Sequence, residues 1–198
     1  MAKKRRKIDS SDSFRFNAER VERLRKAKIL DYIYNIDLSY DLAKVFEEVK
    51  DTPTTPYFPE NPYIDSWFKN TKNWLHGRIE NIGPEVQNIV DQIKELTESK
   101  DVVPKLVRQL AGSPLPLHTD LRKVTDRYNL CAVNIQLTTK VAPVEFEEIG
   151  VLEPYRCALL NVTKRHGVPM ITEERIFIKN SIYDIPYDVA LSNYLKNK

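Results

Sequence analysis

Residues of the types that most often carry chemistry are few in this chain. It contains three histidines and two cysteines in 198 residues, and neither type forms a short motif with metal-ligand spacing. There is no CxxC pair, no glycine-rich phosphate loop and no GxSxG nucleophile motif. We therefore expect no metal site, no cofactor and no catalytic residue from His76, His118 and His166 or from the cysteines.

A set of charged residues offers the other candidate for chemistry. Basic residues at 164–166 and the acidic pair Glu173 and Glu174 would face one another across a predicted hairpin. They can be ordinary cross-strand ion pairs, which contribute about 0.2–1 kcal/mol each. Alternatively, Arg156 and Glu173 or Glu174 would project from adjacent strands into a cavity. There they would bind a small carboxylate or hydroxyl compound.

The strands that would position this site give the clearest pattern in the sequence. Apolar residues alternate with mostly polar ones between Asn129 and Val141. A period of two predicts a half-buried strand. An acidic connector at 142–150 is expected to form one helical turn. It is followed by a predicted hairpin of Tyr155–Thr163 and Val168–Lys179 with a turn at 165–167.

Several short motifs in this block are shared with a known fold family. They are Ala142-Pro143, an acidic turn ending in Ile149-Gly150, Arg156-Cys-Ala-Leu-Leu, and Gly167-Val-Pro followed by a glutamate. On these motifs, residues 131–178 resemble the family of chorismate lyase and the UTRA effector-sensing domains of bacterial regulators. The resemblance implies a small-molecule pocket in which Glu173 or Glu174 is the family's glutamate.

The N-terminal half is predicted to be helical, because apolar residues recur there at helical spacing. The Pro-rich stretch after residue 50 interrupts the pattern, since proline cannot continue a regular helix. Residues 113–119 are expected to form a loop and 119–128 a short helical turn. The predicted helices are Asn17–Tyr34, Asp37–Lys50, one starting at Asn61-Pro62 and carrying Trp67 and Trp74, Pro84–Ser99, Asp101–Leu110 and, at the C-terminus, Pro186–Lys198.

These elements predict an α+β fold, with a helical N-terminal half packed against a small antiparallel β-sheet. We expect three regions. Residues 1–16 would be a basic flexible arm, and 17–112 a helical region with a Pro-rich connector at 51–62. Residues 113–198 would be an antiparallel β-hairpin region with a short C-terminal helix.

Positive charge is concentrated near the N-terminus. The net charge is +3, yet residues 1–28 hold eleven Lys or Arg and four Asp or Glu, so the remainder is net negative. Such an arm can neutralise nucleic-acid phosphates or an acidic partner. It can also be a nuclear-import signal or a solubilising tail. The residues expected to make these contacts are Lys3, Lys4, Arg5, Arg6, Lys7, Arg20 and Arg23.

The composition is that of an ordinary globular protein, with 41% hydrophobic and 30% charged residues. No apolar run approaches the roughly 20 residues that span a bilayer, and the N-terminus lacks the apolar segment of a secretory signal. We expect an intracellular, soluble protein or part of a virion, without membrane contact. Cys131 and Cys157 are expected to be buried thiols, with a disulfide as the alternative.

Missing catalytic motifs and a basic arm favour a non-enzymatic structural or assembly subunit of a larger complex, of virion, connector or nucleoprotein type. Its partners would be other proteins or copies of itself, and nucleic acid through residues 1–28. One alternative is a small-molecule sensor or lyase of the chorismate lyase and UTRA type. The other is a DNA-binding regulator.

Overall fold

The computed structural model describes residues 26–56, 73–120, 123–124 and 127–198. The chain divides into two compact units, residues 1–31 and 32–198. Within the first unit, residues 26–29 are helical. The second unit contains helices α2 (Leu42–Val49), α3 (Pro84–Thr97) and α4 (Tyr187–Asn197). Its strands are β1 (Ile33–Asn35), β2 (Thr55–Pro56), β3 (Trp74–Arg78), β4 (Val102–Gln109), β5 (Leu115–His118), β6 (Lys123–Val124), β7 (Arg127–Tyr128), β8 (Cys131–Gln136), β9 (Glu145–Phe146), β10 (Gly150–Val151), β11 (Cys157–Leu160), β12 (His166–Val168) and β13 (Arg175–Ile182).

Two antiparallel sheets form the body of the larger unit. The larger sheet has the strand order β1-β11-β8-β13-β4-β3-β2, and the smaller has the order β10-β9-β12-β5. Strand β13 lies inside the larger sheet, where Ile178 is paired with Leu106 of β4 and with Ile135 of β8. Strands β6 and β7 pair separately.

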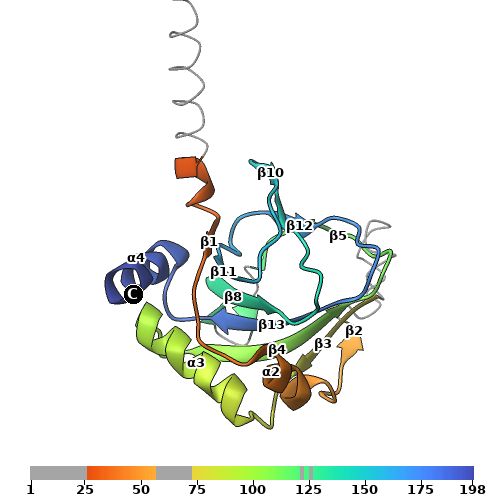
Figure 1. Ribbon diagram of the computed structural model, residues 1–198. Helices are drawn as coiled ribbons and strands as arrows, with labels where there is room; N and C mark the ends of the chain where they lie inside the picture. Colours follow the sequence, from red (N-terminus) through yellow and green to blue (C-terminus); the bar gives the residue numbers. More distant parts are fainter. Residues whose placement is uncertain (1–25, 57–72, 121–122, 125–126) are drawn as a thin grey trace, which may run out of the picture. The chain divides into compact units, whose positions relative to one another are not determined.

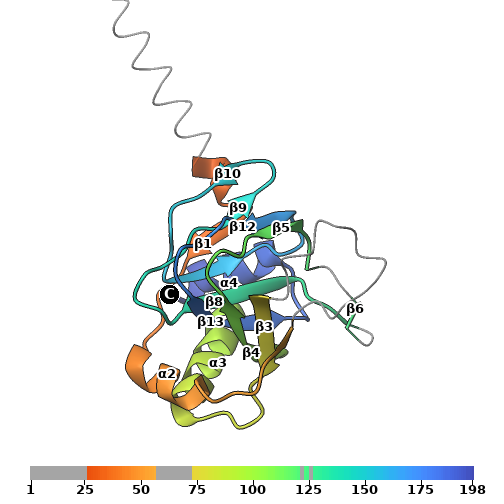
Figure 2. The same cartoon turned by 90° about the vertical axis from the view of Figure 1, so that its right-hand side faces the viewer.

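The larger sheet is covered on both faces. Helices α2 and α3 lie on one side of it and the four-stranded sheet lies on the other (Figures 1 and 2). Every residue of β13 is buried as a result. Because side chains alternate along a strand, Ile176 and Ile178 join the core on the helix side, whereas Phe177 joins a cluster between the two sheets.

The predicted helical N-terminal half is wrong. Residues predicted as the helix Asp101–Leu110 form β4, and Trp74 begins β3 instead of lying on a helix. In β4, Val102, Pro104 and Leu106 are buried in alternation, and β-branched valines favour a pleated surface. The predicted α+β fold is therefore corrected to two facing antiparallel sheets with a few short helices. Residues 17–25 and 57–72 lie outside the described residues.

Three helix predictions are confirmed in whole or in part. Helix α3 begins at Pro84, where proline suits the first helical position, and covers the predicted Pro84–Ser99 almost completely. Helix α4 matches the predicted C-terminal helix. Helix α2 is shorter than predicted, because Asp41 and not Asp37 accepts hydrogen bonds from the first free backbone amides of the helix.

The predicted hairpin does not form. Strands β11 and β13 both pair with β8, one on each side of it, and so do not pair with each other. Two residues of the turn predicted at 165–167, His166 and Gly167, instead lie in β12 of the smaller sheet. The expected cross-strand pairing of residues 164–166 with residues 173–175 is therefore absent. The predicted loop at 113–119, the helical turn at 119–128 and the one at 142–150 contain β5, β7 and β9, respectively.

The strand predicted at 129–141 is confirmed over Cys131–Gln136, but its surroundings differ from those predicted. Cys131, Val133 and Ile135 face the helix-side core as expected. The alternate positions, which include Asn134 and Gln136, are also buried, because the second sheet covers them. Both cysteines are buried free thiols, as expected.

A core substitution in β13 should lower stability strongly. Ile178 is completely buried between β4 and β8, so Ile178→Ala leaves a cavity and should lower the free energy of unfolding by about 2–5 kcal/mol. Urea unfolding followed by circular dichroism measures this. Val151→Ala, at a residue that is 53% exposed, is the control and should stay within about 0.5 kcal/mol of the unmodified chain. Equal effects of the two substitutions would contradict the described core.

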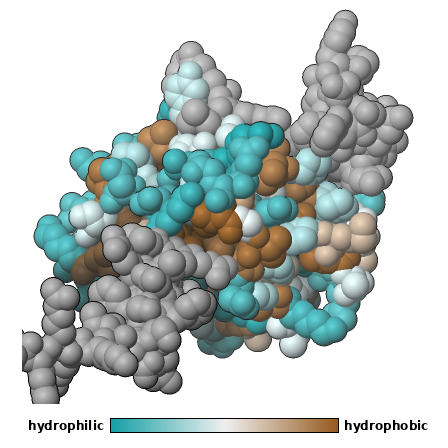
Figure 3. Space-filling view, turned by 90° about the horizontal axis from the view of Figure 1, so that it is seen from above, coloured by the Kyte–Doolittle hydropathy of each residue, from teal (hydrophilic) through white to brown (hydrophobic). Residues whose placement is uncertain are grey.

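Hydrophilic residues cover much of the face shown in Figure 3, with hydrophobic residues gathered toward its middle. Such mixing is common on protein surfaces. Among the described helices, none is both long enough and apolar enough to cross a membrane.

Candidate metal centre

Three potential metal ligands lie close together where strands β5 and β12 of the smaller sheet pair. His118 ends β5, His166 begins β12, and the antiparallel register places these two residues directly opposite each other. Their ring centroids are 4.6 Å apart. Asp120 follows His118 by two residues, and one ligand atom from each of the three residues lies within 4.8 Å of the others. Strand pairing thus joins side chains that are far apart in the sequence.

Backbone contacts orient both imidazoles toward Asp120. His118 Nδ1 is 2.8 Å from the carbonyl oxygen of Pro116, and His166 Nδ1 is 2.9 Å from that of Lys164. Since a carbonyl oxygen can only accept, each Nδ1–H must donate. Each Nε2 lies near a carboxylate oxygen of Asp120, at 3.3 Å from His118 and 3.6 Å from His166. A protonated ring can donate to the carboxylate from this nitrogen, and a neutral ring offers a metal ion the Nε2 lone pair.

The protonation states also suit a metal. Burial alone would raise the pKa of the Asp120 carboxyl, but the Lys179 ammonium and the two imidazoles outweigh it and hold that pKa well below its ordinary value. Burial lowers the pKa of His166, although Asp120 partly opposes this effect. An ionised carboxylate and a neutral imidazole are the forms that bind metal ions. Two imidazoles and one carboxylate with open positions are the ligand set typical of non-haem Fe(II) sites.

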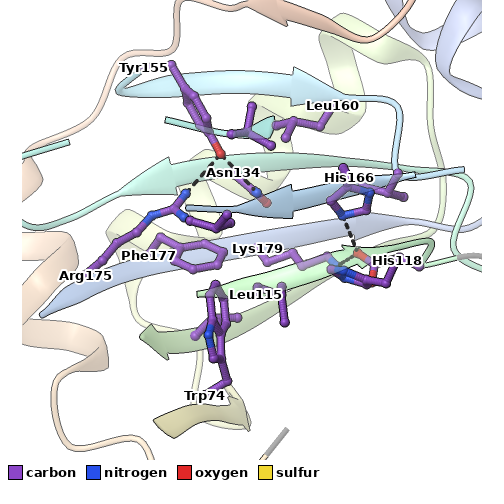
Figure 4. Close-up of a pocket in the computed structure, with 15 residues that line it drawn as sticks. Trp74, Leu115, His118, Asn134, Tyr155, Leu160, His166, Arg175, Phe177 and Lys179 are labelled. Carbon is purple, nitrogen blue, oxygen red and sulfur yellow. Dashed lines mark hydrogen bonds and ion pairs between the residues drawn. The ribbon is translucent and has the colours of Figure 1, made fainter. Parts of the chain in front are cut away.

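The three residues lie at one end of a cavity between the sheets. Figure 4 shows Arg175 and Tyr155 at the other end, with Phe177 between the two ends. The walls are largely apolar and include Trp74, Leu115 and Val168. The space available to the centre of a water molecule is about 40 Å³, which is more than the roughly 10–15 Å³ needed for one water. The cavity is therefore narrow and suits a small ligand.

Arg175 places a buried positive charge in this cavity. Its side chain donates from Nε to Gln136 Oε1 at 2.9 Å and from Nη2 to the Tyr155 hydroxyl at 3.2 Å. Within the described chain, Nη1 has no hydrogen-bond partner, and the two partners named here are neutral. Burial lowers the pKa of Arg175, but a guanidinium stays charged at neutral pH. A buried cation with a spare donor is suited to bind an anionic group.

The residues predicted to bind a ligand lie elsewhere. Arg156 donates to three backbone carbonyls at and just beyond the end of β8, those of Gln136, Thr138 and Thr139. Glu173 contacts Lys140, and Glu174 contacts Arg108 at 2.8 Å. None of the three lines the cavity described above, whose arginine is Arg175. Their predicted ligand-binding role stays a prediction.

The basic residues predicted to contact nucleic acid or a partner lie outside the described residues. Their role, and the predicted partners, also stay predictions. The residues concerned are Lys3, Lys4, Arg5, Arg6, Lys7, Arg20 and Arg23.

Sequence reasoning did not find the His118, Asp120 and His166 cluster. A search for closely spaced ligands fails because the third ligand comes from another strand. A signal was nevertheless present in the His118-Thr-Asp120 spacing, since residues two apart in an extended chain point to the same side. His166 and Arg175 come from later strands, β12 and β13, so no local spacing connects them with this pair.

The sequence matches no family model and no curated protein, but the fold is similar to known structures. A viral collagen prolyl hydroxylase from Paramecium bursaria Chlorella virus-1, in complex with 2OG, aligns with 78% of this chain and 96% of its own, at a TM-score of 0.53 and 12% identity. A Pseudomonas putida prolyl-4-hydroxylase aligns with 72% of this chain and 83% of its own, at a TM-score of 0.50 and 12% identity. HygX from Streptomyces hygroscopicus, with nickel, 2-oxoglutarate and hygromycin B bound, aligns with 78% of this chain and 84% of its own. Its TM-score is 0.50 and its sequence identity is 12%. At such identities the likeness concerns the fold, a jelly-roll-like arrangement of two sheets.

These findings correct two predictions. The resemblance of residues 131–178 to chorismate lyase and UTRA domains is wrong, because the similar structures belong to a different fold. The predicted virion or assembly subunit, and its sensor, lyase and DNA-binding alternatives, are contradicted as well. The matched fold occurs in oxygenase structures, and the described residues include a set that could hold a metal ion.

Proposed function

We propose that this chain is an Fe(II)- and 2-oxoglutarate-dependent oxygenase. In such a reaction, 2-oxoglutarate, O₂ and a substrate C–H group give succinate, CO₂ and a hydroxylated product. The observation that carries the proposal is the meeting of His118, Asp120 and His166 in one cavity with the spare guanidinium donor of Arg175. The fold similarity supports it, since similar structures were solved with 2-oxoglutarate bound.

The three clustered residues would hold the metal through His118 Nε2, His166 Nε2 and a carboxylate oxygen of Asp120. When bound, Fe(II) would supply the activation of O₂ and the chelation of a 2-oxo acid. The chain's own contribution is to fix the ligands: the carbonyls of Pro116 and Lys164 hold each imidazole with its Nε2 turned toward Asp120. Such contacts behind the ligands typically alter metal affinity or activity by 10–100-fold.

Arg175 and Tyr155 would bind the far carboxylate of 2-oxoglutarate. Tyr155 Oη lies 3.2 Å from Arg175 Nη2, and both line the cavity, so a carboxylate beside Nη1 would find charge and hydrogen bonding together. Strand β13 carries Arg175 near one end of the cavity and Lys179 beside Asp120, and four residues of a strand span roughly 13 Å. A short, elongated dicarboxylate suits this separation.

The apolar walls would orient the rest of the cosubstrate and limit water. The Phe177 ring lies 4.4 Å from the guanidinium carbon of Arg175 and belongs to the cluster with Trp74, Val107, Leu115 and Val168. These side chains present hydrocarbon to the methylene groups of 2-oxoglutarate. A largely apolar surrounding also strengthens the attraction between Arg175 and a carboxylate.

Turnover of the cosubstrate tests the proposal. The full chain, incubated with Fe(II), a mild reductant, O₂ and 2-oxoglutarate, is expected to form succinate, which mass spectrometry measures. Omission of Fe(II), omission of O₂ or addition of a chelator should each reduce succinate to the level of a heat-denatured sample. Succinate formation that is indifferent to all three, or absent at every condition, would contradict the proposal.

A further inference from the structure

A second cation enters the cavity from β13. Lys179 is buried, and its Nζ contacts Oδ2 of Asp120 (Figure 4 shows its side chain running toward His118). Lys179 shares a face of β13 with Arg175 and Phe177, since alternate residues of a strand point the same way. The same Asp120 oxygen lies 3.6 Å from His166 Nε2. The ammonium therefore bonds a carboxylate oxygen that a metal ion between Asp120 and His166 would also use.

This contact changes the charge that the site offers. Two neutral imidazoles and one carboxylate present a single negative charge to a metal ion, and the Lys179 ammonium cancels it. A dication entering the site would also meet a positive charge in a buried place, where Coulomb repulsion is weakly screened. A divalent ion should thus bind the three ligands less tightly than it would without Lys179.

We infer that Lys179 is a competing internal cation, which makes tight metal binding depend on the simultaneous binding of a dianionic 2-oxo acid. This inference rests on the proposed function. 2-Oxoglutarate carries two negative charges into the cavity, so its binding restores the negative charge that Lys179 removes. Coupling between two ligands is reciprocal. The cosubstrate should therefore raise metal affinity by the same factor by which the metal raises cosubstrate affinity.

Another role for the same contact leads to the opposite result. Lys179 could merely hold the Asp120 carboxylate in place, as a hydrogen-bonding group behind a metal ligand does. Removing it would then weaken metal binding, by the 10–100-fold typical of such groups. The direction of the change in metal affinity therefore decides between competition and support.

The test is calorimetric titration of Mn(II) into the full chain, with and without 2-oxoglutarate, for the unmodified chain, Lys179→Met and Lys179→Gln. Mn(II) replaces Fe(II) because it is stable in air. In the unmodified chain, 2-oxoglutarate should tighten Mn(II) binding about a hundredfold. Both variants should bind Mn(II) alone about tenfold or more tightly than the unmodified chain, and the enhancement by 2-oxoglutarate should shrink by a similar factor.

Lys105→Met is the matched control. Lys105 is paired directly with Lys179 on β4, and its ammonium lies 3.4 Å from the Tyr183 hydroxyl. The control removes the same charge from the neighbouring position without touching the Asp120 contact. Its Mn(II) affinity and its coupling to 2-oxoglutarate should stay within about twofold of the unmodified chain.

The possible outcomes separate the two proposals. Mn(II) binding that is equally tight with and without 2-oxoglutarate in the unmodified chain would overturn the inference, whether or not the variants fold. Unchanged or weaker Mn(II) binding in both Lys179 variants would also overturn it, while binding of Mn(II) and 2-oxoglutarate by the unmodified chain would leave the oxygenase proposal standing. If the unmodified chain bound neither Mn(II) nor 2-oxoglutarate, both proposals would be overturned.

Discussion

Asp120→Ala is expected to abolish metal binding and to destabilise the chain. Asp120 supplies the one carboxylate of the cluster. Removing a group that only hydrogen-bonds to a metal ligand typically lowers metal affinity by about 10–100-fold. Removing a ligand itself should lower it further, so the affinity for the metal should fall by more than about a hundredfold. The same change leaves the buried Lys179 without its carboxylate. Breaking a buried ion pair in this way costs about 3–5 kcal/mol of folding free energy.

Two measurements check this prediction. Titration with Mn(II) in the presence of 2-oxoglutarate reports metal affinity, and urea unfolding reports stability. Glu173→Ala is the control, because Glu173 forms its ion pair with Lys140 and both side chains are largely exposed. It should leave the metal affinity unchanged and stability within about 0.5 kcal/mol. If Asp120→Ala retained metal affinity while Glu173→Ala lost it, the site would have been assigned to the wrong carboxylate.

Arg175→Met is expected to weaken 2-oxoglutarate binding while leaving a metal site. The guanidinium is the buried cation with a spare donor at the far end of the cavity, and methionine keeps much of its volume without its charge. Truncating one partner of a buried, hydrogen-bonded charge pair costs about 2–5 kcal/mol, which is thirtyfold or more in affinity. Arg175→Lys, which keeps the charge but not the fork of donors, should lose less.

Calorimetry with 2-oxoglutarate at saturating Mn(II) measures this effect. Arg156→Met is the matched control, since Arg156 donates to backbone carbonyls at and just beyond the end of β8 and does not line the cavity. It should bind 2-oxoglutarate as the unmodified chain does. A loss in Arg156→Met and not in Arg175→Met would instead support the ligand site predicted from the sequence, near Arg156 and Glu173.

Elements whose residues determine their own conformation could be predicted from the sequence. Helix α3 has a proline at its start and a long apolar stripe, and α4 also has its apolar residues at helical spacing. Strand β8 showed its period of two. Strands β3 and β4 could not be recognised in the same way. β3 has only five residues, and in β4 the regular alternation of burial breaks at Leu106 and Val107, which are both buried, so helix and strand patterns are hard to separate.

The site escaped prediction because it depends on long-range pairing. His118 and His166 become neighbours through the register of β5 and β12, which no local pattern reveals. The polar residues of β13 were misleading for a related reason. Arg175 and Lys179 alternate with apolar residues, and charged residues at alternate positions of a strand usually mark a solvated face. In the folded chain that face lines the cavity between the sheets, where both charges are buried.

The most direct test of the central claim is the visible absorption of the full chain under anaerobic conditions with Fe(II) and 2-oxoglutarate. A 2-oxo acid chelated by Fe(II) gives a charge-transfer band that neither component gives alone. We expect such a band, which should saturate at one equivalent of each component per chain and be missing from Asp120→Ala. No band at saturating Fe(II) and 2-oxoglutarate, or an equal band in Asp120→Ala, would contradict the assignment of His118, Asp120 and His166 as the metal site of an oxygenase.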